Sequence, residues 1–139
     1  MKIKRVEHVA IAVKDLQQMS DVLESVFGMR RAYSEDFPTH GTRLAMYPVG
    51  ETYLELLEGY TPQAGASKWL DEHGQSLYHL CLEVDDIEAA LAELRDKGIR
   101  LINETPITGH GGSRVAFVDP ADTGNLLFEL VEEIGSGQH

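Results

Sequence analysis

The chain has 139 residues, enough for one compact domain or for two small halves that share a core. Hydrophobic residues make up 42% and charged residues 25%, which is ordinary for a globular protein. A formal charge of -11 excludes nucleic acids and anionic membranes as expected partners, because such polyanions are repelled by the protein's field.

Cysteine content and the N-terminal segment point to a cytoplasmic protein. Cys81, the single cysteine, cannot form an internal disulfide, and its apolar neighbours indicate a small buried side chain in a reducing compartment. No apolar segment follows the basic N-terminal residues, and no stretch approaches membrane-spanning length. Residues 135–139 are expected to form a disordered tail.

The first half of the chain predicts a strand, a helix and three further strands. Residues Val6–Val13 alternate in the manner of a strand and are rich in β-branched side chains. Apolar residues then recur at helical spacing from Leu16 to Phe27, and Gly28 is a plausible C-terminal stop. The later elements are strands at Met29–Ser34, Arg43–Pro48 and Thr52–Leu57, and a short helix at Ala66–His73.

The second half repeats this order. His79 aligns with His8 at an offset of 71 residues (79 − 8), and the segment that begins at Gly112 aligns with the one that begins at Gly41 at the same offset. A helix is expected from Ile87 to Leu94 with Gly98 as its stop, and Asp85 with Glu88 resembles a capping box. The remaining strand candidates are Arg100–Asn103, Arg114–Val118 and Leu126–Val131.

This duplication predicts an α+β fold built from two tandem βαβββ modules that form a curved mixed sheet. We expect residues 1–134 to form a single domain, with the repeats at about 1–73 and 74–134.

Four polar residues interrupt the apolar faces of the predicted strands at repeat-related positions: His8, Glu55, His79 and Glu129. A carboxylate buried alone is prohibitively costly, so on a buried face these groups must be paired or must bind a metal. Two imidazoles and two carboxylates suit Mn²⁺, Fe²⁺, Co²⁺, Ni²⁺ or Zn²⁺. The repeat therefore predicts one divalent metal ion that these four residues share.

The paired modules resemble the vicinal oxygen chelate superfamily, which includes glyoxalases, bleomycin resistance proteins and dioxygenases. Within it, the chain is most similar to the methylmalonyl-CoA epimerases, through the segments Ala66–Leu70, Val84–Ile87, Asn103–Pro106 and Gly109–Arg114. The resemblance runs over nearly the whole chain. It implies a dimeric isomerase that uses a divalent ion (Co²⁺, Mn²⁺, Ni²⁺ or Zn²⁺) and an acyl-CoA substrate.

The resemblance also implies roles for single residues. The family's metal ligands fall on His8, His79 and Glu129, and Glu55 occupies a fourth position. Glu129 is expected to carry the C2 proton on one face of the substrate. Some epimerases have a second catalytic glutamate at the position of Leu44, which cannot move a proton. Either Glu55 or a water molecule then acts on the opposite face, or the substrate is different.

Anion recognition is expected from a small set of residues. The basic candidates are Lys68, Arg43 and Arg114, and Gly111, Gly112 and Ser113 offer backbone N–H groups. Two alternatives remain open: a glyoxalase I-like isomerase that acts on a hemithioacetal, and a metal-free binding protein of the resistance type. A dioxygenase is disfavoured because such enzymes usually have four modules.

Overall fold

The computed structural model describes residues 1–134, so the expected tail lies outside the described residues. The chain divides into two compact units. The first-repeat unit is His8–Tyr78, and the second-repeat unit combines Met1–Glu7 with the chain from His79 onward. The chain therefore passes between the units within β1 (Ile3–Ala12) and within β5 (Ser76–Val84), at His8 and at His79.

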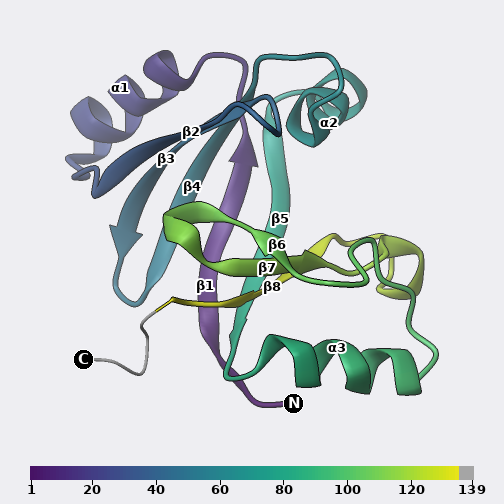
Figure 1. Cartoon of the computed structure of the whole chain (residues 1–139). Coiled ribbons are helices and arrows are strands. Elements are labelled where there is room, and N and C mark those ends of the chain that lie inside the picture. The colour runs from purple at the N-terminus through teal and green to yellow at the C-terminus, as the bar shows by residue number, and fades with distance from the viewer. Residues whose placement is uncertain (135–139) are drawn as a thin grey trace. The chain divides into compact units, whose positions relative to one another are not determined.

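The first-repeat unit has the strand order β2-β3-β4-β1 (Figure 1). β1 and β4 are parallel, whereas β3 is antiparallel to both β2 and β4. Its elements after β1 are α1 (Leu16–Phe27), β2 (Tyr33–Phe37), β3 (Thr42–Val49), β4 (Thr52–Gly59) and α2 (Gly65–His73).

The second-repeat unit has the same design, with the strand order β1-β5-β8-β7-β6 and with β5 parallel to β8. Its elements after β5 are α3 (Ile87–Asp96), β6 (Ile107–Thr108), the 3₁₀ turn η1 (His110–Gly112), β7 (Arg114–Phe117), η2 (Pro120–Asp122) and β8 (Phe128–Glu132). The prediction of two βαβββ modules is confirmed by the order and pairing of these elements.

Helix ends follow local chemistry. The Asp15 side chain accepts a hydrogen bond from the Gln18 N–H at the start of α1, and Gly28 ends that helix in the left-handed conformation, as predicted. The predicted capping box at the start of α3 is wrong by one residue. Asp86 is the N-cap and accepts from the Ala89 N–H, while the Glu88 carboxylate pairs with Arg114 instead.

Two predicted strands are also wrong. The strand expected at Met29–Ser34 lies later, at Tyr33–Phe37, because Met29 packs into the core beside α1. The strand expected at Arg100–Asn103 is reduced to a single bridge between Leu101 and Val118.

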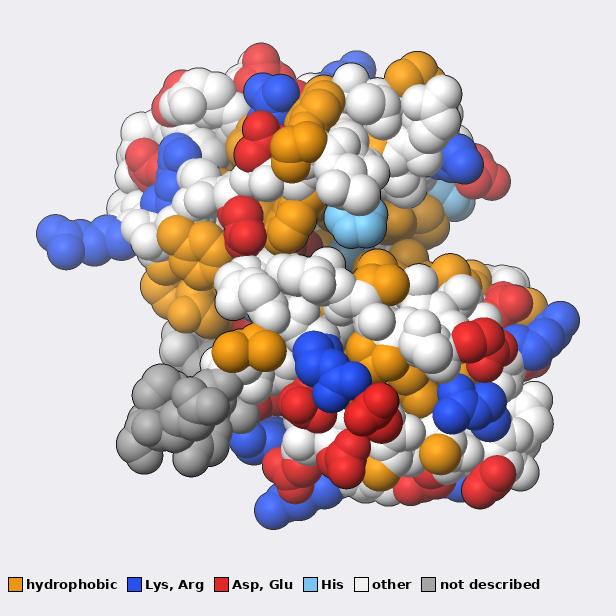
Figure 2. All heavy atoms as spheres, in the orientation of Figure 1, with side chains coloured by type: hydrophobic (Ala, Val, Ile, Leu, Met, Phe, Trp, Pro, Cys, Tyr) orange, Lys and Arg blue, Asp and Glu red, His pale blue; other side chains and the backbone are white. Residues whose placement is uncertain are grey.

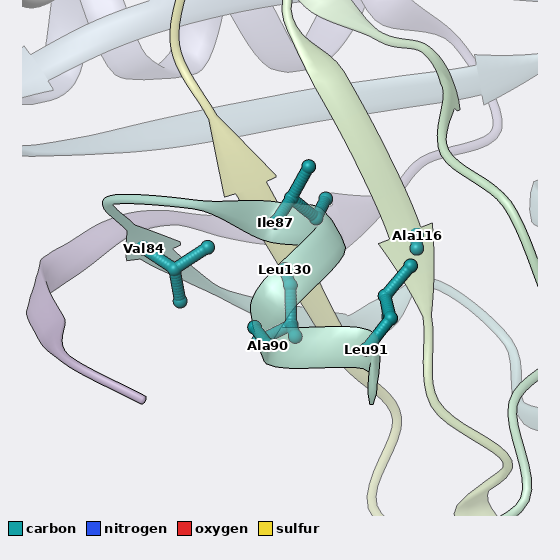
Figure 3. Packing of buried hydrophobic residues seen from close by; sticks show 6 residues of the cluster. All are labelled: Val84, Ile87, Ala90, Leu91, Ala116 and Leu130. Atoms are coloured by element: carbon teal, nitrogen blue, oxygen red, sulfur yellow. The ribbon is translucent and has the colours of Figure 1, made fainter. Parts of the chain in front are cut away.

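The core of the second-repeat unit lies between α3 and the sheet. Leu91 of α3 points toward Ala116 of β7 (Figure 3). Ile87 of α3 and Leu130 of β8 belong to the same buried cluster, and each of these residues is at most 3% exposed. The first-repeat unit has the equivalent core between α1 and strands β3 and β4, made by Val13, Leu23, Ala45, Tyr47 and Leu56. Within residues 1–134 no helix combines the length and apolar composition needed to cross a membrane.

Leu91→Ala is expected to lower the free energy of unfolding by about 2–5 kcal/mol, because it leaves a cavity in a packed core. Leu91 is 1% exposed, whereas the control residue Leu126 is 64% exposed. Leu126→Ala should change the stability by less than about 0.5 kcal/mol. Chemical denaturation measures both, and equal effects would contradict the core assignment.

Candidate functional site

The first-repeat unit brings His8 and Glu55 together. His8 lies on β1 two residues before Ala10, which is paired with Glu55 of the parallel strand β4. The His8 Nε2 and Glu55 Oε1 atoms are 3.5 Å apart. His8 is 0% exposed and Glu55 is 4% exposed, so the imidazole and carboxylate neighbour each other away from bulk water.

The second-repeat unit brings His79 and Glu129 together in the same way. His79 lies two residues before Cys81, which is paired with Glu129 of the parallel strand β8. The His79 Nε2 and Glu129 Oε1 atoms are 3.1 Å apart. The Phe117 ring meets the His79 ring edge to face, with centroids 5.1 Å apart. The repeat that the sequence indicates thus reproduces one His–Glu pair twice, at equivalent register.

The donor chemistry of both pairs fits a divalent metal ion. Each pair offers an imidazole nitrogen and a carboxylate oxygen, and all four side chains are buried. Nitrogen and oxygen donors of this kind suit divalent first-row metals rather than Cu⁺, which prefers thiolates and thioethers. A buried carboxylate is also stabilised by a nearby cation.

A third buried His–Glu contact was not predicted. The His110 Nε2 and Glu7 Oε1 atoms are 3.0 Å apart, and the two residues are 8% and 1% exposed. No role for His110 is predicted from the sequence, because a single histidine in a glycine-rich loop has no counterpart in the other repeat. Glu7 could have been suspected, since a carboxylate beside His8 interrupts the alternation of β1.

Glu7 belongs to a larger charged cluster in the second-repeat unit. Arg5 contacts the Glu83 carboxylate at 2.6 Å through Nε and the Glu133 carboxylate at 2.8 Å through Nη2. Burial, a hydrogen bond with Glu7 and the nearby Glu83 charge raise the pKa of the Glu133 carboxyl from 4.5 to about 7, although Arg5 opposes the shift. Glu133 is therefore a carboxyl that keeps its proton up to near neutral pH.

The shifted pKa of Glu133 predicts a pH-dependent stability. Between pH 4.5 and about 7 the folded chain retains a proton that the unfolded chain has lost, so the free energy of unfolding falls as the pH rises through this window. Glu133→Gln should lack this contribution, since an amide does not titrate here. Denaturant unfolding between pH 5 and 8 should show the wild type losing stability relative to Glu133→Gln. Parallel curves would contradict the assignment, and Glu72→Gln on exposed α2 serves as the control.

The predicted anion-binding residues lie in several places. Arg43 is stacked on the Tyr60 ring, with 4.6 Å from its guanidinium carbon to the centroid, and Lys68 is exposed on α2. Arg114 lies 3.3 Å from Glu88 and 3.7 Å from Glu132. Acidic and basic side chains are also intermixed on the face drawn in Figure 2. Much of the positive charge on these side chains is therefore neutralised by neighbouring carboxylates.

The loop before β7 is a tight turn in which the Gly112 and Ser113 N–H groups donate to the carbonyl oxygens of Gly109 and His110. Gly111 and Gly112 have φ angles of 62° and 78°, in the left-handed region that glycine tolerates best. The Ser113 hydroxyl donates to the His110 carbonyl oxygen at 2.7 Å, and Ser113 is 3% exposed. Together with Arg114 these residues form one continuous segment of the second-repeat unit.

Leu44 is a buried residue of β3. It is 2% exposed and is paired with Leu57 of β4. Met46, two residues further along β3, is paired with Glu55. A carboxylate at position 44 would lie two residues along β3 from Met46, the residue paired with Glu55. Leucine at this position has no group that could transfer a proton.

Comparison with known proteins identifies relatives of the whole chain. The model of the Glyoxalase/Bleomycin resistance protein/Dioxygenase superfamily matches residues 7–117. Methylmalonyl-CoA epimerase of Mus musculus is 33% identical over 93% of this chain and 73% of its own length. The ethylmalonyl-CoA/methylmalonyl-CoA epimerase of Cereibacter sphaeroides is 32% identical over 92% of this chain and 97% of its own. A variant of the Streptomyces coelicolor methylmalonyl-CoA epimerase in complex with 2-nitronate-propionyl-CoA has a TM-score of 0.92, 31% identity and 96% coverage of both chains.

Proposed function

Because the chain belongs to the glyoxalase/bleomycin resistance protein/dioxygenase superfamily, we propose that it is a metal-dependent epimerase that interconverts the C2 epimers of methylmalonyl-CoA. The observation that carries the proposal is the His–Glu pair that occurs at equivalent register in both repeats. Relatives at about one-third identity over most of the chain support the reaction and the acyl-CoA substrate.

The proposal assigns His8, Glu55, His79 and Glu129 to one divalent ion, either Co²⁺, Mn²⁺, Ni²⁺ or Zn²⁺. Support comes from the duplication, since each repeat contributes the same nitrogen and oxygen donors at equivalent register. When bound, such an ion supplies a Lewis acid that stabilises negative charge developing on a substrate oxygen.

Glu129 is the proposed base on one face of the substrate. Glu129 is 6% exposed, and its carboxylate lies 3.1 Å from the His79 imidazole. Little bulk water can therefore reach this carboxylate. Inversion at C2 needs a proton carrier on each face, because the proton that leaves one face must be replaced on the other. Glu55, the repeat-related carboxylate, is the first candidate for the second carrier.

Substrate binding is proposed for the segment Gly111–Arg114 together with Arg43 and Lys68. Support comes from the basic side chains, because positive charge suits the carboxylate and phosphate groups of an acyl-CoA and Arg114 directly follows this loop. Local basic groups are needed for such a ligand because the chain carries a formal charge of -11.

The proposed enzyme is a cytoplasmic homodimer. Support for self-association comes from large apolar side chains that the chain leaves exposed, among them Val26 and Phe27 at 68% and 69%. Sedimentation of the purified protein measures this state.

Deuterium exchange tests the proposed reaction. The protein, loaded with metal, is incubated in D₂O with each enantiomer of methylmalonyl-CoA, and mass spectrometry follows deuterium at C2. We expect solvent deuterium in both enantiomers, together with their interconversion. If neither enantiomer takes up deuterium while the protein holds its ion, the proposal is wrong, and a hemithioacetal becomes the substrate to test.

A further inference from the structure

Phe117 of β7 is an aromatic side chain that lies against the His79–Glu129 pair. The Phe117 and His79 ring centroids are 5.1 Å apart, and the two ring planes cross at 83°. Aromatic rings favour such perpendicular arrangements at centroid separations of about 4.5–7 Å. Turning the imidazole about its side-chain bond would give up this favourable contact. The Phe117 ring therefore restrains the orientation of His79.

The strand register also places Phe117 beside Glu129. The two residues are direct partners in the antiparallel pairing of β7 with β8. Both backbone polar groups of Phe117 are bonded to Ile102 and Asn103, so they point away from β8. In a pair of this kind the two strands exchange no hydrogen bonds, the Cα atoms are about 4.5 Å apart, and the side chains lie close together. Phe117 is thus a neighbour of both His79 and Glu129.

Asn103 holds the backbone of Phe117 in place. The Asn103 Oδ1 atom accepts a hydrogen bond from the Phe117 N–H at 2.8 Å. The Phe117 carbonyl oxygen accepts another from the Ile102 N–H at 2.9 Å. Phe117 is the last residue of β7, which spans Arg114–Phe117. These bonds therefore secure the end of the strand, and with it the base of the aromatic side chain.

The first-repeat pair has a methionine at the equivalent position. Met46 lies 71 residues before Phe117 (117 − 46), which is the offset of the repeat, and it is paired with Glu55. A methionine side chain is flexible and adapts its shape to its surroundings, whereas a phenyl ring is rigid. The distance between the imidazole Nε2 and the carboxylate Oε1 is 3.5 Å in the first-repeat pair and 3.1 Å in the second. The rigid contact thus belongs to the pair that contains the proposed base, Glu129.

We infer that Phe117 is a positioning residue, which holds the His79 imidazole in the orientation in which Nε2 faces the Glu129 carboxylate. The inference rests on the proposed function, in which His79 and Glu129 bind the ion and Glu129 is also the base. A side chain that is already held in its binding orientation loses less freedom when a ligand binds, so the affinity is higher. If the ring is removed, the ion must also order the imidazole, and its affinity falls.

Phe117→Leu tests this role, because leucine keeps an apolar side chain but has no ring. The dissociation constant for Co²⁺, measured by visible absorption, should rise by about 2–12-fold, the effect of losing one aromatic contact. Phe117→Tyr keeps the ring and should bind Co²⁺ as the wild type does. Phe128→Leu is the matched control, because Phe128 is also partly buried but precedes Glu129 on β8 and so faces the other side of the sheet.

A measurement on the metal-free protein separates this role from the proposed function. In the wild type, nuclear Overhauser contacts should connect the His79 imidazole protons with the Glu129 side chain. We expect these contacts to weaken in Phe117→Leu and to persist in Phe117→Tyr and Phe128→Leu. If the wild type binds no Co²⁺, the proposed function fails, and the Overhauser contacts still decide whether Phe117 orients His79.

Asn103 provides a second pair of variants if Phe117→Leu folds poorly. Asn103→Ala removes the acceptor of the Phe117 N–H, so it should weaken the same Overhauser contacts and raise the dissociation constant for Co²⁺. Asn103→Asp keeps an acceptor oxygen and should retain the wild-type contacts.

Three outcomes overturn the inference. Unchanged Overhauser contacts and Co²⁺ affinity in Phe117→Leu would mean that the ring does not orient His79. Equal losses in Phe117→Leu and Phe128→Leu would indicate general destabilisation of the sheet. Failure of Phe117→Tyr to retain the wild-type affinity would show that the aromatic contact is not the cause.

Discussion

Glu129→Gln is expected to slow C2 proton exchange of one enantiomer of methylmalonyl-CoA by about 10²–10⁴-fold, the usual cost of removing a catalytic acid or base. Glutamine has nearly the same shape and keeps an oxygen toward the His79 imidazole, which lies 3.1 Å from the carboxylate in the native chain. It cannot accept a proton. The enantiomer that loses its proton on the opposite face should still exchange, although net epimerisation should stop.

This measurement needs a variant with the same chemical change elsewhere. Glu72 lies on α2 with a side chain that is 76% exposed, so Glu72→Gln should exchange both enantiomers as the wild type does. Because Glu129 is also a proposed metal ligand, metal content must be measured in parallel. Exchange within tenfold of the wild type for both enantiomers, with the ion bound, would contradict the role of Glu129 as a base.

The four residues of the two His–Glu pairs could be singled out from the sequence because the same residue types recur in both repeats. A lone histidine on a strand is usually an ordinary buried or edge residue, but His8 and His79 occur at the same position of two repeats. Strand pairing then places Glu55 opposite Ala10 and Glu129 opposite Cys81, which are equivalent positions of the two repeats. Periodicity of two along each strand was sufficient to place these side chains within the sheet.

Element ends were less predictable, because they depend on competition between neighbouring groups. Asp85 and Asp86 are both able to cap a helix, and only the backbone conformation selects Asp86, which has a φ angle of -139°. The expected strand around Leu101 failed for a similar reason. Arg100 directs its backbone N–H and its guanidinium to the Asp122 carboxylate, and this contact shapes the segment.

The His110–Glu7 contact lay beyond sequence reasoning. The two residues are 103 positions apart, and neither has a counterpart in the other repeat that would single it out. Gly109 of this loop lies close to Val115, and the His110 imidazole lies 3.0 Å from the Glu7 carboxylate of β1. The charged cluster of Arg5, Glu83 and Glu133 depends in the same way on the pairing of β1 with β5 and of β5 with β8.

The second large expected effect is the loss of metal affinity when a proposed ligand is removed. We expect the purified chain to bind one divalent ion, and His79→Ala to weaken its binding by more than the 10–100-fold typical of changes to residues that only support ligands. Ligand binding stabilises the folded state by about 2.7 kcal/mol at a hundred times the dissociation constant. A chelator should therefore lower the melting temperature of the wild type but barely change that of His79→Ala. His73→Ala, on the exposed end of α2, is the matched control.

The duplication sharpens this test, since His8 and His79 occupy equivalent positions of the two repeats. If both histidines bind one ion, His8→Ala and His79→Ala should weaken binding to a similar extent, and each should leave at most one weak site per chain. Titration with Co²⁺, followed by its visible absorption, measures affinity and stoichiometry directly. Two ions per wild-type chain, with each variant losing one of them, would mean that every His–Glu pair binds its own ion. Full affinity in either variant would remove that histidine from the ligand set.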